Sequence, residues 1–405
     1  MIFSRLNIGA KVSCIIALLV VVCVCALSIC VILFSKEAME GQNEKILNQS
    51  TYRYANLFNG VAMQTLDLLH ARAGVIDMQI NNNPNISDLE NAVASLLESI
   101  RSTNYVYLYI PRLNISLNGT TNQQQVVILA GQGSIGEKPR VIEDNGLITQ
   151  FESIHKAMIN NRASLSDPQK INFQNRELFV QSFSVPIHDA NGNAIGALGC
   201  LVDFNIIGAP FLSPEAQVFV NDQRFVINEN GIISVNQNPQ YVGAKLDQLV
   251  PTQQAKDIVV AAKQGRGGIF PYRTAAGIEG VISMYAVEPI PESGAYWNII
   301  SYIPNSSIMQ PIIKLTWIII VLGVASIVLV VLVTMLYLRV SVTSRIRIIR
   351  NILAECFKYL NHETKQPPVL VPVNSHDELG NMAEAINANI EKTQKSLEQD
   401  SHAVS

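Results

Sequence analysis

Charge and pairable cysteine are both scarce in this sequence. Only 15% of its 405 residues are Asp, Glu, Lys or Arg, and the formal net charge is −3. A chain without a basic excess gives no indication of a nucleic-acid partner. Four of the six cysteines lie within one apolar run, one lies alone in the centre and one lies near the C-terminus: Cys14, Cys23, Cys25, Cys30, Cys200 and Cys356. A lone central cysteine forms no internal disulfide, so a hydrophobic core must hold the central region together.

Motifs of catalysis and of metal binding are missing as well. The sequence has no CxxC pair and no His/Cys spacing of a zinc site, and its six histidines are scattered singly. It also lacks GxSxG, HExxH, a P-loop and a GxGxxG placed between a strand and a helix. The glycine-rich segment Gly265–Gly268 has no following Lys-Ser/Thr and is interpreted as a turn. We therefore expect no enzyme activity, no bound metal and no cofactor.

Two long uncharged runs are present, at residues 12–34 and 315–338. Each is long enough to cross the hydrocarbon layer as a helix of about 20 residues. The first run exceeds the apolar core of a cleaved signal peptide, and no small-x-small cleavage site follows Phe34. The alternatives are a cleaved signal and buried core helices. We favour two membrane spans that bracket a large polar region.

Basic residues near these runs predict the orientation. Four arginines follow the second run before any acidic residue, and a Lys and an Arg precede the first: Arg339, Arg345, Arg347, Arg350, Arg5 and Lys11. Lys36, after the first run, is offset by Glu37 and Glu40. The positive-inside rule then places both termini, including residues 1–11, in the cytoplasm. The region 35–310 is expected outside the membrane, with membrane lipid around the two spans.

The region 35–310 begins with a helical pattern. No proline occurs from Ser35 to Gln79, and apolar residues recur at spacings of three and four. Glycines at 60 and 74 allow a kink, and the Asn- and Pro-rich segment 81–85 predicts the end of the helix. A second helix is expected over 87–102, with Ser87 as its cap and Glu90 completing a capping box.

Strand patterns then occur in two groups. The first group is expected at 105–110, 125–130, 177–185 and 194–204, with a turn at Asn118-Gly119, a helix over 151–160 and a hairpin turn at 189–192. The second is expected at 217–227, 232–235, 268–272, 280–286 and 297–303, with a helix over 252–264. These groups predict an α+β class: two stacked modules of antiparallel sheet with helices, a distal one over about 80–210 and a proximal one over about 211–304.

Three segments carry a family resemblance. FSVPIHDANGNAIGALGCLVDF (183–204) resembles the β-hairpin of double Cache sensor domains, with Asp203 in its second strand. VINENGIISVNQNPQYVGAKL (226–246) and YAVEPIPESGAYWNIISYIP (285–304) resemble the opening and closing parts of the membrane-proximal Cache module. The resemblance covers about 35–310. It implies two PAS-like Cache modules, reached through a long helix that continues from the first membrane span.

The resemblance also places a ligand in the distal module, against the sheet. The candidate contacts are Tyr107, Tyr109, Asp167 and Asp203. Tyrosines offer stacking and hydroxyl groups, and an aspartate holds an ammonium group. In the alternative interpretation the tyrosines pack against the long helix and Asp203 caps a strand end. The Arg-x-Trp pair of amino-acid-binding relatives is missing between 80 and 210, which argues against an α-amino acid.

After the second span, 339–398 shows two heptad segments joined by the proline-containing connector QPPVLVPV (366–373). Asp377, Glu378 and Gly380 open the second segment and resemble the Asp-Glu-x-Gly motif of HAMP signal relays. Ser344 and Arg345 stand where such relays often have a proline. The resemblance implies a parallel four-helix bundle built from two chains, and hence a homodimer. The alternative is a plain antiparallel helical hairpin, and 399–405 is a tail.

Together these patterns predict the sensing half of a bacterial inner-membrane chemotaxis receptor of the methyl-accepting type. The expected partner outside is a small-molecule ligand or a periplasmic binding protein. No methylation and kinase-contacting hairpin follows within the sequence, so the chain is expected to be a fragment or a truncated receptor; the chemotaxis kinase and adaptor are partners only if such a hairpin exists. The alternatives are the sensing half of a histidine kinase or diguanylate cyclase, and a non-signalling binding or adhesion protein.

Overall fold

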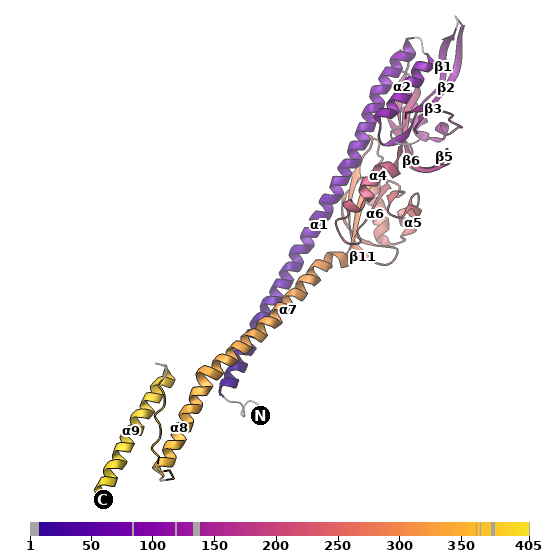
Figure 1. The fold of residues 1–405 in the computed structure, drawn as a ribbon. Helices are drawn as coiled ribbons and strands as arrows, with labels where there is room; N and C mark the ends of the chain where they lie inside the picture. Colours follow the sequence, from indigo (N-terminus) through magenta and orange to yellow (C-terminus); the bar gives the residue numbers. More distant parts are fainter. Residues whose placement is uncertain are drawn as a thin grey trace. The chain divides into compact units, whose positions relative to one another are not determined.

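The computed structural model describes residues 8–404 except 83–84, 118–119, 133–137, 362, 365 and 374–376. The chain forms two compact units (Figure 1). One is residues 37–311, and the other combines 1–36 with 312–405. The predicted turn at Asn118-Gly119, the proline of the 81–85 segment and most of the predicted N-terminal segment 1–11 lie outside the described residues.

Helix α1 (Ile8–Asn81) is unbroken, so the predicted membrane span and the helix after it form one element. Neither Gly60 nor Gly74 interrupts it, and a side chain at either position would meet open space. A helix of 74 residues is about 110 Å long at 1.5 Å per residue. Within the unit 37–311, α1 runs along both sheet modules (Figure 1). Both modules therefore pack on the same helix.

The distal module is an antiparallel sheet in the order β3-β2-β1-β7-β6-β4, with β5 paired to β6. Its elements are α2 (Ile86–Ser99), β1 (Thr103–Leu117), β2 (Thr120–Gly131), β3 (Arg140–Ile142), α3 (Glu152–Asn160), β4 (Ser164–Leu165), β5 (Gln169–Phe173), β6 (Arg176–His188) and β7 (Ala194–Asp203). The long strands and α3 confirm the predicted pattern, while β3, β4 and β5 are short additions at the sheet edges.

Strand β1 shows how the sequence sets the two faces of this sheet. Successive side chains of a strand point to opposite faces. Val106, Leu108 and Ile110 therefore join the core that includes α1 and α2. Tyr105, Tyr107 and Tyr109 join a separate core with α3 and β5. The tyrosines consequently do not pack against the long helix, which corrects that alternative.

The proximal module is a smaller antiparallel sheet in the order β10-β11-β12-β8-β9. Its elements are α4 (Phe204–Leu212), β8 (Gln223–Asn228), β9 (Ile233–Asn236), α5 (Leu246–Leu249), α6 (Gln253–Lys263), β10 (Gly268–Arg273), β11 (Glu279–Val287) and β12 (Trp297–Pro304). The apolar face of α6, with Ala255 and Ile258, covers one side of this sheet. The α+β class and the two sheet modules are as predicted.

Two local predictions were wrong, and one helix was not predicted. The cap of α2 is Asn85, whose side chain accepts from the Ser87 N–H at 3.2 Å, so Ser87 lies inside the first turn. Strand β8 begins at Gln223, because the Asp222 carboxylate accepts from the Val218 N–H at 2.8 Å and closes a loop there. Helix α4 was missed, since it contains Gly208 and Pro210, residues that argue against a helix.

Trp297 at the start of β12 connects the parts of the unit 37–311. Its ring is 1% exposed and lies 5.6–6.0 Å, centroid to centroid, from Phe58 of α1, Phe183 of β6 and Phe204 of α4. Its indole N–H donates to Gln181 Oε1 at 2.6 Å. The long helix and both modules therefore share one aromatic cluster.

The second unit contains two helical stretches long and apolar enough to cross a membrane, in α1 and in α7 (Asn305–Leu338). The most apolar window of each is fully unburied within the protein. A Cβ placed on Gly323 of α7 would lie 3.2 Å from Val24 of α1, so the two apolar segments are in close contact there. Small residues permit such close packing of membrane helices.

A π-helical stretch at Arg339–Thr343 joins α7 to α8 (Ser344–Leu360). Helix α9 (Glu378–Val404) follows the connector. The backbone N–H and C=O of Val371 in the connector bond to the side-chain amide of Asn387 at 2.7 and 2.8 Å. Val371 also packs with Ile349 and Ala383. The connector is thus fixed to both helices through one apolar residue and one amide.

Replacing Trp297 with Ala should destabilise the unit 37–311 by about 3–5 kcal/mol, because a fully buried aromatic is lost from a cluster that three elements share. Trp297→Phe should cost less, about 1–3 kcal/mol, because it keeps the ring but leaves Gln181 Oε1 without its donor. Thermal unfolding of the full chain in lipid nanodiscs, followed by circular dichroism, measures both. Equal melting of the Ala variant and the native chain would contradict this role for Trp297.

Candidate functional site

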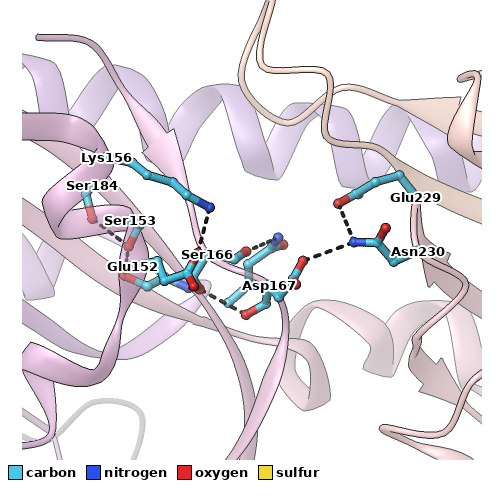
Figure 2. A network of polar contacts seen from close by, with 10 residues as sticks. Glu152, Ser153, Lys156, Ser166, Asp167, Ser184, Glu229 and Asn230 are labelled. Atoms are coloured by element: carbon cyan, nitrogen blue, oxygen red, sulfur yellow. Dashed lines mark hydrogen bonds and ion pairs between the residues drawn. The ribbon is translucent and has the colours of Figure 1, made fainter. Parts of the chain in front are cut away.

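The hydroxyl of Tyr107 lies in a closed network of serines in the distal module. It is 2.6 Å from Ser182 Oγ and 2.7 Å from Ser184 Oγ. Ser153 Oγ of α3 is 2.8 Å from both serine hydroxyls; its bond to Ser184 is drawn in Figure 2. Burial raises the pKa of Tyr107 to about 12. The network therefore fixes α3 on the sheet through neutral hydroxyl groups.

Gly199 of β7 leaves room for the Tyr107 ring. Tyr107 pairs with Gly199 across the strands, and a Cβ there would overlap the Tyr107 ring and the Phe183 carbonyl oxygen. The glycine is thus required by a close approach. Tyr107 is completely buried, so it acts in the structure as a core residue. Tyr109, on the same face, is 9% exposed, and its hydroxyl has no hydrogen bond within the described residues.

Asp203 stands at the junction between the modules, at the Tyr105 end of the tyrosine face, where burial raises the pKa of Tyr105 and the charge of Asp203 raises it further. Its carboxylate accepts from the Asn205 N–H at 2.9 Å and caps helix α4, whereas the alternative prediction had it capping a strand end. Burial raises the pKa of Asp203. Tyr109 pairs with Ala197, and Asp203 lies six residues further along β7, about 20 Å away. A single small ligand cannot contact both.

Asp167 lies in an exposed polar group where the modules meet (Figure 2). Asn230 of the β8–β9 turn donates to Asp167 Oδ1 and to Glu229 Oε1, both at 3.4 Å. Glu229 also accepts from the Tyr296 N–H at 3.1 Å. Burial raises the pKa of Glu229, and the negative charge of Asp167 raises it further. The structure thus separates Asp167 from the tyrosine face and gives it an intermodule contact.

A groove with a volume of about 610 Å³ opens in the same unit, and no sequence pattern predicted it. Its lining comes from α1, from the turn after α3, from β6 and from the β11–β12 loop: Leu66, His70, Ala73, Gly74, Asp77, Asn161, Arg162, Ala163, Pro186, His188, Ile290, Pro291, Glu292 and Ser293. A smaller, mainly apolar cavity of about 270 Å³ lies between α1 and α4. Among the described residues, no cluster of His, Cys, Asp and Glu is placed to hold a metal ion.

A buried ion pair lies where the distal module passes into the proximal sheet. Arg224 Nε is 3.5 Å from Asp222 Oδ1, and both side chains are almost inaccessible. Arg224 also donates to the carbonyls of Phe211 and Ser213 at 2.6 and 3.1 Å. The chain between the modules is therefore fixed by Arg224, the second residue of β8.

In the second unit, Asp377 caps α9. Its Oδ1 accepts from the Gly380 N–H at 2.9 Å, and its Oδ2 lies 3.2 Å from Arg345 Nη1 of α8. Glu378 is in the first turn, where a carboxylate is favourable. Asp377 and Gly380, two of the three predicted relay residues, therefore meet each other and α8 at the start of α9.

Comparison with known proteins identifies the fold but no family. No protein-family model and no curated protein matches the chain. The periplasmic sensory domain of the Campylobacter jejuni chemoreceptor Tlp1 is similar, with a TM-score of 0.59 and 18% identity over 67% of this chain and 99% of that domain. A structure named methyl-accepting chemotaxis protein X has a TM-score of 0.54 and 11% identity, over 66% of this chain and 99% of that one. The extracellular domain of a protein described as histidine kinase mmHK1S-Z3 has a TM-score of 0.52 and 13% identity, over 69% of this chain and 98% of that domain.

At these identities the likeness establishes fold alone. The unit 37–311 has the fold of periplasmic and extracellular sensory domains found in chemoreceptors and a histidine kinase. The chain combines this domain with two helices long and apolar enough to span a membrane.

Replacing Asp203 should separate its capping role from its charge. Asp203→Ala should cost about 0.5–2 kcal/mol by removing the cap, whereas Asp203→Asn keeps an accepting oxygen. Because burial raises the folded pKa above the unfolded one, the carboxyl adds stability as the pH falls through its folded pKa, and the gain is complete below the unfolded pKa near 4. Asp203→Asn should lose this gain. Melting temperatures measured between about pH 4 and 7 test this prediction. An identical pH dependence in the native chain and in Asp203→Asn would show that the pKa of Asp203 is not raised.

Proposed function

We propose that the chain serves as the sensor of a transmembrane chemoreceptor, which binds a small molecule outside the membrane and passes a conformational signal inward. The observation that carries this proposal is the position of the domain. A unit with the fold of a chemoreceptor sensory domain, matched over 99% of that domain, lies between two apolar helices. The arginines after the second helix support cytoplasmic termini.

The route for a signal follows the end of the proximal sheet. Strand β12 ends at Pro304 and α7 begins at Asn305, so no linker separates them. The Ser307 hydroxyl donates to the Val220 carbonyl at 2.5 Å, in the loop that Asp222 closes. Movement of β12 or of this loop would therefore act on α7 directly. A ligand shifts such an equilibrium only by its differential affinity for the two states.

The end of the route is a relay of the HAMP type in residues 339–398. The Asp377 cap, its contact with Arg345 and the connector packed through Val371 support this part of the proposal. The histidine kinase with the same fold supports the second candidate, a sensor that drives a kinase. Both candidates share the input mechanism and differ only in the output domain.

A homodimer is supported by the outer face of α1. Seven residues recur at alternating spacings of four and three: Leu57, Val61, Gln64, Leu68, Ala71, Val75 and Met78. Five of them are exposed, and the half-buried Val61 and Leu68 also pack partly against the core of the unit. This is the heptad spacing of a coiled-coil seam. Because a two-fold axis sets the same surface against itself, a second copy of the chain fits this stripe in parallel orientation.

Cysteines placed on the stripe should cross-link two copies. In a background without native cysteines, Leu68→Cys and Val75→Cys should form disulfide-linked dimers on mild oxidation in membranes, because seam residues face their equivalents within the reach of a disulfide. Met63→Cys is the matched control, since it is exposed but lies about 140° round the helix from Leu68. Equal cross-linking at Met63 would rule out this seam.

A ligand of the distal module should raise the melting temperature of the full chain in nanodiscs. At a ligand concentration 100 times Kd, the free energy of unfolding should increase by about 2.7 kcal/mol. Because the Tyr109 hydroxyl on the tyrosine face makes no hydrogen bond with a described residue, Tyr109→Phe should weaken a metabolite hit about tenfold. Tyr241→Phe, on a partly exposed tyrosine of the proximal module, is the control. A metabolite screen without a stabilising compound, or a hit that both variants bind equally well, would contradict the proposed site.

A further inference from the structure

The groove between α1 and the two modules has the position and size of a binding site. Its volume of about 610 Å³ falls within the range of ligand pockets, about 300–1,000 Å³, which prefer junctions between domains. Arg162, Pro186 and His188 come from the distal module, and the loop 290–293 comes from the proximal one. The tyrosine face belongs to a different core and does not line it.

One wall of the groove is held rigidly. His188 donates its backbone N–H to Asp77 Oδ1 at 2.8 Å, and its ring Nδ1 is 3.2 Å from Asp77 Oδ2. The other ring nitrogen is 2.8 Å from Asn161 Oδ1. These bonds tie α1, β6 and the turn after α3 together around the groove. A site whose wall is already ordered loses less entropy when a ligand binds.

Two groups of opposite charge in the groove lack a partner. The guanidinium of Arg162 and the carboxylate of Glu292 are exposed, and neither makes a hydrogen bond or an ion pair with any described residue. Arg162 comes from the distal module and Glu292 from the proximal one. The rest of the lining includes the apolar side chains of Leu66, Ala73 and Ile290 and the polar side chains of the wall formed by Asp77, Asn161 and His188.

The backbone at Glu292 adds an independent observation. Glu292 has a φ of +62°, in the left-handed region that glycine favours. It follows Pro291 in a turn closed by the Ser293 N–H to the Ile290 carbonyl at 3.2 Å, at the position where type II turns prefer glycine. A glutamate here costs stability that a glycine would not. Such strain is typical of functional positions.

We propose that this groove binds a short peptide with free termini, with its C-terminal carboxylate at Arg162 and its N-terminal ammonium at Glu292. A guanidinium matches a carboxylate with two parallel hydrogen bonds. The apolar lining receives the side chains of the peptide. A ligand of one charge alone would leave either Arg162 or Glu292 unpaired, whereas a zwitterion pairs with both, and a groove of about 610 Å³ has room for a short peptide. The site lies apart from the distal tyrosine face, so it adds a second input to the proposed sensor.

Calorimetry with the tripeptide Ala-Leu-Ala and the full chain in nanodiscs tests the proposal. C-terminal amidation or N-terminal acetylation of the peptide should each weaken binding about tenfold or more, because each removes one charge-assisted contact. Arg162→Gln should cause the same loss for the free peptide and abolish the effect of amidation. Glu292→Gly, which relieves the positive φ and so should fold at least as well, should abolish the effect of acetylation.

Arg266→Gln is the matched control, because Arg266 is exposed in the proximal module and lies outside the groove. Its peptide binding should equal that of the native chain, and melting curves verify the fold of each variant. Failure of Ala-Leu-Ala to bind, or binding that is equally sensitive to capping in Arg162→Gln and in the native chain, would overturn the proposal. Either result would leave the Tyr109 test of the sensor function unaffected, since that site is read with a different ligand.

Discussion

The aromatic cluster around Trp297 is the contact on which the sensory domain depends. It joins a ring of α1, a ring of the distal sheet and a ring of α4 to the first residue of the last proximal strand. The surrounding core is a single continuous cluster, which extends from α1 and α2 through β1, β6 and β7 to β8, β9 and β12. Close-packed interiors transmit displacement because they have few alternative arrangements. The two modules are therefore mechanically one body, although each has its own sheet.

Helix α1 packs against both modules with one face. Phe58, Ala62, Leu69 and Ile76 are fully or almost fully buried against the modules. The heptad stripe from Leu57 to Met78 lies beside this buried face: Val61 and Leu68 still pack partly on the core, whereas Leu57, Val75 and Met78 are exposed. Packing on the modules alone requires only one apolar face, so this second row of apolar residues needs a separate explanation. The sequence of α1 thus carries two patterns, one that packs on the modules and one that fits the proposed dimer.

The sequence predicted those parts of the fold that repeat with a short period. Alternation in β1, the Asn-Gly hairpin turn at 189–192 and the apolar runs each depend on neighbours within a few residues, and the structure has each of them as predicted. The failures involve residues that act over a distance or against their usual preference. Helix α4 contains Gly208 and Pro210 and is stabilised by burial of Phe204 and Phe211. The start of β8 depends on a side chain, Asp222, that bonds to its own preceding loop.

The candidate site illustrates the same limit. Residue type led to Tyr107, Tyr109, Asp167 and Asp203, but register and burial place them at separate positions: a closed core network, a free hydroxyl, an intermodule contact and a helix cap. The groove was not predictable, because its fixed wall pairs Asp77 with His188, 111 residues apart. No local pattern connects such residues. Only the folded sheet, packed on α1, brings them together.

The buried pair of Asp222 and Arg224 shows how such a body could still change state. Asp222 Oδ1 and Arg224 Nε are both buried, and at 3.5 Å they make no hydrogen bond with each other or with another described residue. Burial of charge without a complete set of partners is costly. An arrangement that shortened this contact would recover part of that cost and move the loop whose Val220 carbonyl holds Ser307 of α7. The unsatisfied pair thus lies at the start of β8, next to the loop that bonds to Ser307 of α7.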